Sequence, residues 1–207
     1  MEQKDRIQEK ANEMFMRYGI RSVSMDDIAG QLGMSKKTLY QYFADKDELV
    51  EAVMQDEVQS GQEDCELCLR ESANAIEEIF FIMKGLVEQF RHINPMVMYD
   101  LQKFHHTAYQ KFLAYKNDFL LRIIRDNLER GLKEGLYRDD FSIDIISRFR
   151  LQSMMSGFDI EAFPPSKYNV ADVTQEILRH YLYGIVSLEG YKWILNYKNE
   201  QTKTAQS

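Results

Sequence analysis

The sequence predicts an all-α fold. Apolar residues recur at helical spacing through most of the chain, and no long run alternates between apolar and polar residues as a strand would. The three prolines are confined to Pro95, Pro164 and Pro165, which leaves long stretches free of helix-breaking residues. With 207 residues the chain is long enough to bury a sizeable core in one or two domains.

The first two predicted helices have clear ends. The first runs from about Asp5 to Tyr18 on an apolar stripe, and Gly19 stops it. Ser24 opens the second helix with Asp27 three residues later, which is a capping-box pattern, and Gly33 ends it. The apolar stripe of the first helix consists of Ile7, Ala11, Met14, Phe15 and Tyr18.

Ser35 begins a third, short helix that ends near Phe43. At 100° per residue, Leu39 and Phe43 fall on one side and anchor the helix in the core. Polar and cationic residues occupy the other side, with tyrosines on the flanks. These residues are Lys37, Thr38 and Gln41, flanked by Tyr40 and Tyr42. Asp45 and Glu48 then cap a fourth helix.

Two short helices with a tight turn between them, the second presenting a polar face, predict a helix-turn-helix that reads a DNA major groove. Lysines neutralise phosphates, while hydroxyl groups donate hydrogen bonds to them. Gln41 is the candidate for an adenine edge, and Lys37 is an alternative reader of guanine. The predicted DNA-binding residues are Ser24, Ser35, Lys36, Lys37, Thr38, Tyr40, Gln41, Tyr42 and Lys46.

The segment IQEKANEMFMRYGIRSVSMDDIAGQLGMSKKTLYQYFADKDELVEAVM resembles the N-terminal domain of TetR-type transcriptional regulators, over about the first quarter of the chain. Lys37 departs from the pattern, because many members have a small residue there. The matching residues are Ala11, Phe15, Gly19, Met25, Ile28, Ala29, Gly33, Ser35, Thr38, Leu39, Tyr40, Tyr42, Phe43, Lys46 and Leu49. The resemblance implies a larger helical domain after this one, which binds an effector and forms a dimer through its last two helices.

The remaining helices are predicted over 46–70, 73–92 and 96–104, with a break at Asn94 and Pro95. A longer helix ends between Gly131 and Gly135. Another starts at Asp140 or Ser142 and reaches about Phe158, and a last one spans 170–197 after the loop at Pro164 and Pro165.

Two apolar rows on the last helices fit either a dimer interface or the core of a single protomer. One row comprises Phe141, Ile145 and Phe149; the other comprises Ile177, Tyr181 and Ile185, with Leu178, Leu182 and Val186 beside it. A homodimer also suits DNA binding, because two recognition helices read the two halves of a palindromic operator.

The middle helices are rich in aromatic residues and methionine, which are able to line an apolar cavity. Most such side chains simply pack in a protein core. These residues therefore have two interpretations, namely ordinary core packing and the wall of an effector pocket. The candidate effector-binding residues are Phe81, Gln89, His92, Tyr99, His105, Tyr109, Phe112 and Met154.

The net charge of −7 argues against a general polyanion binder. Residues 1–46 are nearly neutral, with eight Lys or Arg and seven Asp or Glu, so the acidic surplus lies outside the predicted DNA-binding region. No apolar segment is long enough to span a membrane and no signal-peptide pattern begins the chain, so we expect a cytoplasmic protein.

No catalytic motif is present, and we expect neither an enzyme, nor a cofactor, nor a metal site. Cys65 and Cys68 lie three residues apart, which leaves open a metal- or redox-responsive regulator as an alternative. Two small, partly buried residues are the simpler interpretation of this pair.

The sequence thus predicts a helix-turn-helix domain over 1–47, an effector-binding and dimerisation domain over 48–200, and a polar tail over 201–207. The expected function is that of a one-component transcriptional repressor. A small hydrophobic effector would release it from its palindromic operator in double-stranded DNA.

Overall fold

The computed structural model describes residues 2–204, with side chains over residues 2–197. Helices dominate this part of the chain, which confirms the predicted all-α fold. In order they are α1 (Gln3–Tyr18), α2 (Met25–Leu32), α3 (Lys36–Tyr42), α4 (Lys46–Glu71), α5 (Ala75–Phe90), α6 (Met96–Phe104), α7 (His106–Ala114), α8 (Leu121–Lys133), α9 (Ile143–Ser153), α10 (Val170–Ile185) and α11 (Leu188–Thr204). A π-helical segment, Tyr115–Leu120, joins α7 to α8, and a 3₁₀ turn, Ser156–Phe158, follows α9.

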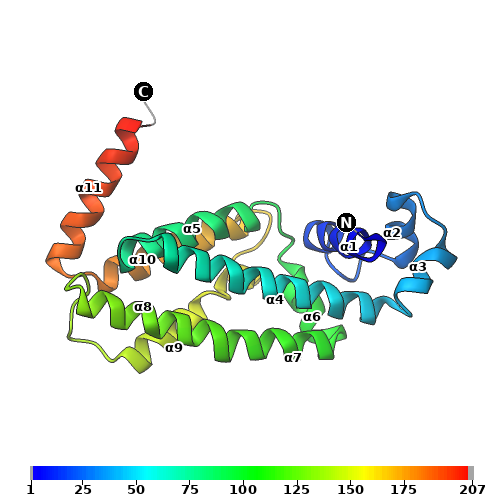
Figure 1. Cartoon of the computed structure of the whole chain (residues 1–207), viewed down its shortest axis with the longest axis horizontal. Coiled ribbons are helices and arrows are strands. Elements are labelled where there is room, and N and C mark those ends of the chain that lie inside the picture. Colours follow the sequence, from blue (N-terminus) through cyan, green and yellow to red (C-terminus); the bar gives the residue numbers. More distant parts are fainter. Residues whose placement is uncertain (1, 205–207) are drawn as a thin grey trace.

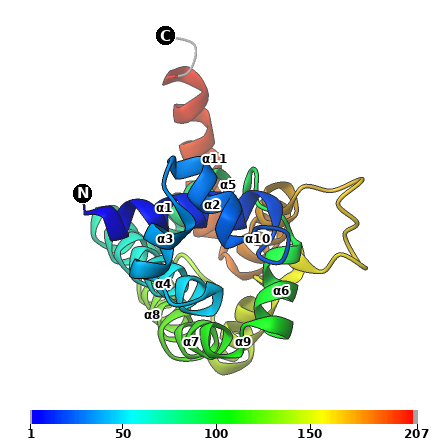
Figure 2. The ribbon, with the colours of Figure 1, turned by 90° about the vertical axis from the view of Figure 1, so that its right-hand side faces the viewer.

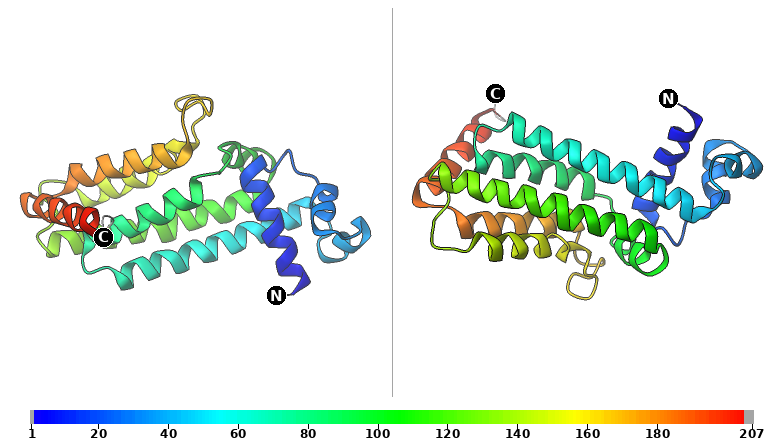
Figure 3. Two further views of the ribbon diagram at one scale, coloured as in Figure 1. Left: turned by 90° about the horizontal axis from the view of Figure 1, so that it is seen from above. Right: turned by 60° about the horizontal axis from the view of Figure 1, so that its bottom comes forward.

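The molecule is elongated, with α1, α2 and α3 at one end and α11 projecting from the other (Figure 1). The helix α4 runs from the first end toward the second, alongside the rod formed by α7 and α8 (Figures 1 and 3). The helices α5 and α10 pack against each other in the second half of the molecule. None of the described helices combines the length and apolar character needed to cross a bilayer.

The N-terminal helices begin and end where the sequence predicts. The Ser24 side chain accepts from the backbone N–H of Asp27 over 3.1 Å, and the Asp27 carboxylate accepts from the N–H of Ser24, which completes the capping box. Gly33 closes α2 with φ 65°, a left-handed conformation that glycine adopts without strain. Asp45 caps α4 by accepting from the N–H of Glu48 over 2.8 Å.

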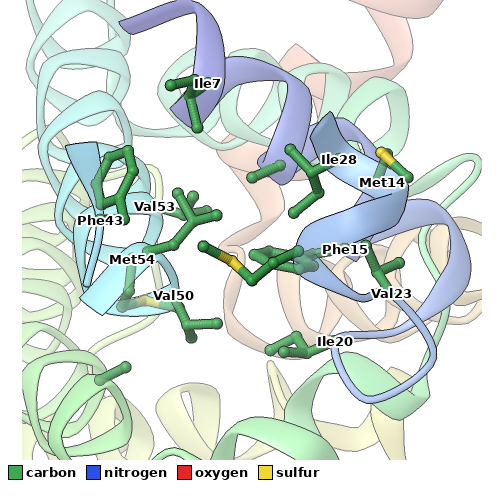
Figure 4. Packing of buried hydrophobic residues seen from close by; sticks show 14 of the residues in the cluster. Ile7, Met14, Phe15, Ile20, Val23, Ile28, Phe43, Val50, Val53 and Met54 are labelled. Carbon is green, nitrogen blue, oxygen red and sulfur yellow. The ribbon is translucent and has the colours of Figure 1, made fainter. Parts of the chain in front are cut away.

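One hydrophobic core holds the N-terminal helices onto the start of α4. Figure 4 shows Ile7, Phe15 and Ile28 facing Val50, Val53 and Met54 across this core. Val97 and Leu101 of α6 belong to the same cluster, so the core is shared between the predicted DNA-binding region and the helices after it. The predicted domain boundary at residue 47 falls within the first turn of α4, and a continuous helix crosses it.

A second core fills the opposite end. It joins the start of α5 to α8, α10 and α11 through Ile76, Leu128, Leu178, Leu182 and Ile194. Tyr137 anchors this region, because its hydroxyl lies at hydrogen-bonding distance, 3.0 Å, from both Ala75 O and Asn127 Oδ1.

The prediction of one last helix over 170–197 is wrong, because the chain breaks at Val186 and Ser187. The backbone N–H of Arg138 donates to Ile185 O and that of Ser187 to Leu136 O, each over 2.9 Å, so a bridge to the segment after α8 replaces a helical turn. Ser187 then caps α11 by accepting from the N–H of Gly190. A Cβ on Gly190 would lie 2.1 Å from Leu136 O, so this close approach requires glycine.

Other differences from prediction are small. The helix predicted to reach Phe158 ends at Ser153 and continues as the 3₁₀ turn. In the predicted polar tail, residues 201–204 continue α11, and residues 205–207 lie outside the described part of the chain.

Candidate nucleic-acid interface and ligand cavity

The short helix α3 has one buried and one exposed side. Leu39 is 0% exposed and Phe43 1% exposed, so these two side chains fix the helix to the N-terminal core. Lys37, Tyr40 and Gln41 are exposed. Figure 2 looks onto this end of the molecule, where α1, α2 and α3 lie in front. The side opposite the anchor is therefore free to contact another molecule.

Most of the other predicted DNA-binding residues lie around this surface. Ser24 and Ser35 are exposed helix caps, and Thr38 is half-buried, with its N–H donating to Ser35 Oγ over 3.1 Å. Tyr42 is exposed on the flank of α3. Lys36 is exposed and pairs with Asp26 over 2.8 Å, and this carboxylate raises the pKa of the lysine.

Lys46 is placed differently from its predicted role at a phosphate. Its Nζ donates to Ile20 O over 2.6 Å and lies 5.9 Å from the centre of the Phe15 ring. Burial lowers the pKa of this ammonium group. In this conformation Lys46 ties α4 to the turn after α1.

A cavity of about 800 Å³ lies behind the N-terminal domain, with walls from α1, α4 to α10 and the π-helical segment. This volume is within the range of pockets that hold small organic ligands. Four predicted effector-binding residues line it, namely Phe81, Gln89, Phe112 and Met154.

The other four predicted residues lie outside this wall. His92 and Tyr99 are exposed. His105 Nδ1 is 2.6 Å from Asp47 Oδ1, which links the start of α7 to α4. Tyr109 packs against the N-terminal core and stacks on Phe112 with 6.3 Å between ring centres.

The cavity also has buried polar groups that the sequence did not predict to lie there; they include Glu78, Asn127, Arg150, Thr174 and Tyr181. Glu78 is 2% exposed and pairs with Arg130 Nη1 over 3.0 Å; burial raises the pKa of its carboxyl group. Arg150 is 5% exposed, and burial lowers the pKa of its guanidinium to about 10. Because charged residues usually lie at the surface, no local signal in the sequence marks these two as buried.

Cys65 and Cys68 also line the cavity. Burial raises the pKa of the Cys65 thiol to about 12 and also raises the pKa of Cys68. Both shifts disfavour the thiolate, which is the form that binds metals and reacts with oxidants. Among the described residues, no group of three or more His, Cys, Asp and Glu is arranged to hold a metal ion.

The two apolar rows on the later helices differ in exposure. Ile145 is 66% and Phe149 56% exposed on α9. In contrast, Leu178, Tyr181, Leu182 and Ile185 of α10 are buried within the protomer. Of the two interpretations of the α10 row, the structure therefore supports a core of the chain itself, whereas the α9 row remains open to a partner.

Residues 7–53 match the family model described as bacterial regulatory proteins, tetR family. The chain is 34% identical over 95 residues to YvaF of Bacillus subtilis, an uncharacterised helix-turn-helix transcriptional regulator. This alignment covers 45% of the chain and spans half the length of YvaF.

The transcriptional repressor KstR2 of Mycobacterium tuberculosis is 26% identical over 147 residues, which cover 68% of this chain and 72% of KstR2. The KstR2 structure superposes with a TM-score of 0.64 at 21% identity, over 90% of this chain and 96% of that one. A TetR-family regulator from Agrobacterium tumefaciens gives a TM-score of 0.74 at 16% identity, over 89% and 97%. The chain carries a helix-turn-helix domain of the tetR family of bacterial regulatory proteins over residues 7–53, and the superpositions extend the shared fold over the helices behind it.

Proposed function

We propose that the protein is a dimeric, one-component transcriptional repressor without enzymatic activity. It binds a palindromic operator in double-stranded DNA in the cytoplasm, and a small hydrophobic effector releases it. The observation that carries this proposal is the surface of α3, where Lys37, Tyr40 and Gln41 are exposed above the buried Leu39 and Phe43. A helix held in this way presents polar side chains to base edges and phosphates.

The net charge of −7 makes local placement of cations decisive. The lysines of α3 stand beside hydroxyl groups that donate to phosphates, and the acidic surplus lies elsewhere in the sequence. Binding to DNA through such a surface releases counterions, so its affinity falls steeply with salt.

The helix α4 supplies a physical connection between effector and operator. Its first turn contacts the N-terminal core through Leu49 and Val50, while Met54, Val58 and Gly61 line the cavity further along. A ligand that displaces α4 therefore also moves α3. The two half-sites of an operator are fixed by DNA geometry, so a small change in the separation of two recognition helices prevents simultaneous contact. The effector must prefer the form that does not bind DNA.

Dimerisation is assigned to the exposed face of α9. Ile145 and Phe149 stand one turn apart and are both more than half exposed, which is unusual for large apolar side chains in a protomer that acts alone. The relative KstR2 is a repressor, which favours repression over activation for this chain.

Selection from a random pool of DNA duplexes tests the proposal and identifies the operator sequence in the same experiment. We expect the full-length protein to enrich a palindrome and to bind it in a mobility-shift assay. Raising the salt from 50 to 200 mM should weaken binding by roughly 10³-fold if six or more phosphates are contacted. Failure to enrich any sequence would contradict the proposal.

Two variants locate the DNA contact. Replacing Tyr40 and Gln41 together with alanine should abolish operator binding and leave the fold intact, because both side chains are exposed. The matched control is Lys133→Ala, which removes an exposed cation at the end of α8 far from α3 (Figure 1). Unchanged operator affinity in the double variant would exclude α3 as the reading helix.

A further inference from the structure

Arg150 is a buried cation without an acidic partner. It projects from α9 into the wall of the cavity and is 5% exposed. Its Cζ lies 5.6 Å from the centre of the Tyr181 ring, and its Nη1 is 3.4 Å from Ser153 Oγ, at the outer limit of a hydrogen bond. No carboxylate within residues 2–197 lies within 4.0 Å of its guanidinium. Most of its five N–H donors are therefore available to a ligand.

The other buried charges near the cavity are satisfied. Glu78 pairs with Arg130, and the half-buried Glu57 accepts from Asn12 Nδ2 over 2.6 Å and from Gln89 Nε2 over 3.2 Å. Because a lone ion is costly to remove from water, proteins commonly pair buried charges in this way. Arg150 is an exception that the packing of the protomer alone does not explain.

A second polar group at the same cavity also lacks a partner. Thr174 on α10 is 6% exposed, and its Oγ1 makes no hydrogen bond. It lies on the face of α10 that carries Leu178 and Tyr181, one and two turns further on, and all three side chains line the cavity. The guanidinium and this hydroxyl are thus two hydrogen-bond donors in the cavity wall.

The rest of the wall is mainly apolar. Large side chains from several different elements enclose the cavity, among them Phe81, Leu86, Met98, Phe112, Leu120 and Ile124. Lys116 is the other cation in the wall, but it is only half-buried and remains accessible to water. A ligand that fills this space therefore needs a large hydrocarbon body and a polar group at Arg150.

The geometry points to a hydrocarbon monocarboxylate as the ligand, with its carboxylate on Arg150 and its apolar body against the aromatic and aliphatic wall. Guanidinium and carboxylate groups match in shape and form two parallel hydrogen bonds. A single negative charge neutralises the single unpaired buried cation, whereas a dianionic phosphate would bring a second negative charge that this cation does not neutralise. The proposed binding depends only on this site, whereas the role of the ligand as an effector rests on the proposed function.

Calorimetric titration of the full-length protein tests the site with matched pairs of probes. Dodecanoate and its methyl ester represent a linear body, and deoxycholate and its methyl ester a polycyclic one, all used below their micelle concentrations. We expect at least one acid to bind 10-fold or more tightly than its ester. The pair that shows the larger preference identifies the class of body. Equal affinity for acid and ester in both pairs would overturn the proposal.

Variants assign the preference to Arg150. Arg150→Gln should reduce the ratio of acid to ester affinity to about one while ester binding persists, and Arg150→Lys should restore part of it. The matched control is Arg148→Gln on the same helix, where Arg148 is exposed and pairs with Asp144. A full acid preference in Arg150→Gln, or its loss in Arg148→Gln, would refute the assignment. Circular dichroism melts confirm that each variant folds.

A mobility-shift assay on the selected operator separates this proposal from the proposed function. We expect the preferred acid to release wild-type protein from DNA and to leave Arg150→Gln bound. If the acid binds through Arg150 without changing DNA affinity, the site is correct and its effector role is wrong. If the protein selects no operator but shows the acid preference, only the proposed function fails.

Discussion

The backbone N–H of Arg21 donates to Oδ2 of Asp100 over 2.9 Å, and this bond joins the turn after α1 to α6. Asp100 is 4% exposed, so the pair is shielded from water. The N–H of Asn94 donates to Met16 O over 2.6 Å in the same region. Because Val97 and Met98 of α6 also line the cavity, α6 is a second route, besides α4, by which a ligand affects the N-terminal helices.

Replacing Asp100 with alanine should weaken this junction. The Arg21 N–H would lose its acceptor in a partly buried place, which costs about 1–3 kcal/mol. We expect a lower free energy of unfolding in urea and faster amide hydrogen exchange in residues 19–23. Asp100→Asn is the control, because its side-chain oxygen still accepts the hydrogen bond. If Asp100→Ala proves as stable as wild type, the bond is not important for the junction.

Local signals in the sequence were sufficient to predict the helices of the N-terminal domain and their caps. The caps at Ser24, Ser35 and Asp45 depend on residues three positions apart, so they are legible without tertiary structure. The same holds for the anchor formed by Leu39 and Phe43, which share a face of a two-turn helix. These features position the candidate DNA surface, and the structure agrees with each of them.

The remaining prediction errors lie where contacts between residues far apart in the sequence determine the structure. The break at Val186 follows from hydrogen bonds to the segment around Leu136 and Arg138, about fifty residues away, although Ser187 and Gly190 carry a local capping signal. Lys46 turns inward because Ile20 O is available to it. Arg150 is buried only because α9, α10 and the cavity wall enclose it, and nothing in its neighbouring sequence indicates this.

A charge on the exposed row of α9 should prevent dimer formation. Phe149→Glu places a carboxylate on the surface of α9 that we propose contacts the partner protomer. Burying this carboxylate there without a counter-ion is costly. We expect a monomer by light scattering and at least a 10-fold loss of operator affinity, because each half-site then binds alone. Phe149→Leu keeps an apolar side chain and should remain dimeric. If Phe149→Glu remains dimeric, the dimer interface lies elsewhere on the protomer.

The carboxyl group of Glu57 should make the free energy of unfolding depend on pH. Burial raises its pKa above the ordinary value of 4.5, against the opposing effect of hydrogen bonds from Asn12 and Gln89. The folded protein therefore retains this proton after the unfolded chain has lost it. By linkage, Glu57 favours the folded state most at low pH, and that contribution is lost as the pH rises through the folded pKa.

Glu57→Gln removes the titration, so its stability relative to wild type should increase as the pH is raised from 4 to 7. Urea unfolding of both proteins at several pH values measures this difference. Gln59→Glu, which adds an exposed carboxyl group two residues along α4, is a control for general charge effects. A difference between Glu57→Gln and wild type that is constant with pH would show that the carboxyl group is unperturbed in solution.

Arg150 should reduce the stability of the protein when no ligand is bound. Its guanidinium is removed from water without a counter-ion, and the lowered pKa, about 10, reflects the same desolvation. Arg150→Met replaces it with an apolar side chain of comparable length. We expect the free energy of unfolding to rise by about 1–3 kcal/mol, with the lost contact to the Tyr181 ring as a smaller opposing effect.

Urea unfolding of the ligand-free proteins measures this change, and Arg148→Met, at an exposed position, should stay within about 0.5 kcal/mol of wild type. Addition of the preferred carboxylate should reverse the order, because ligand binding stabilises the wild type by mass action and the variant far less. A cation that destabilises the empty protein and stabilises the occupied one is explained by the ligand that it binds. If Arg150→Met is less stable than wild type without ligand, Arg150 has a structural partner in solution, and its role is packing within the protomer.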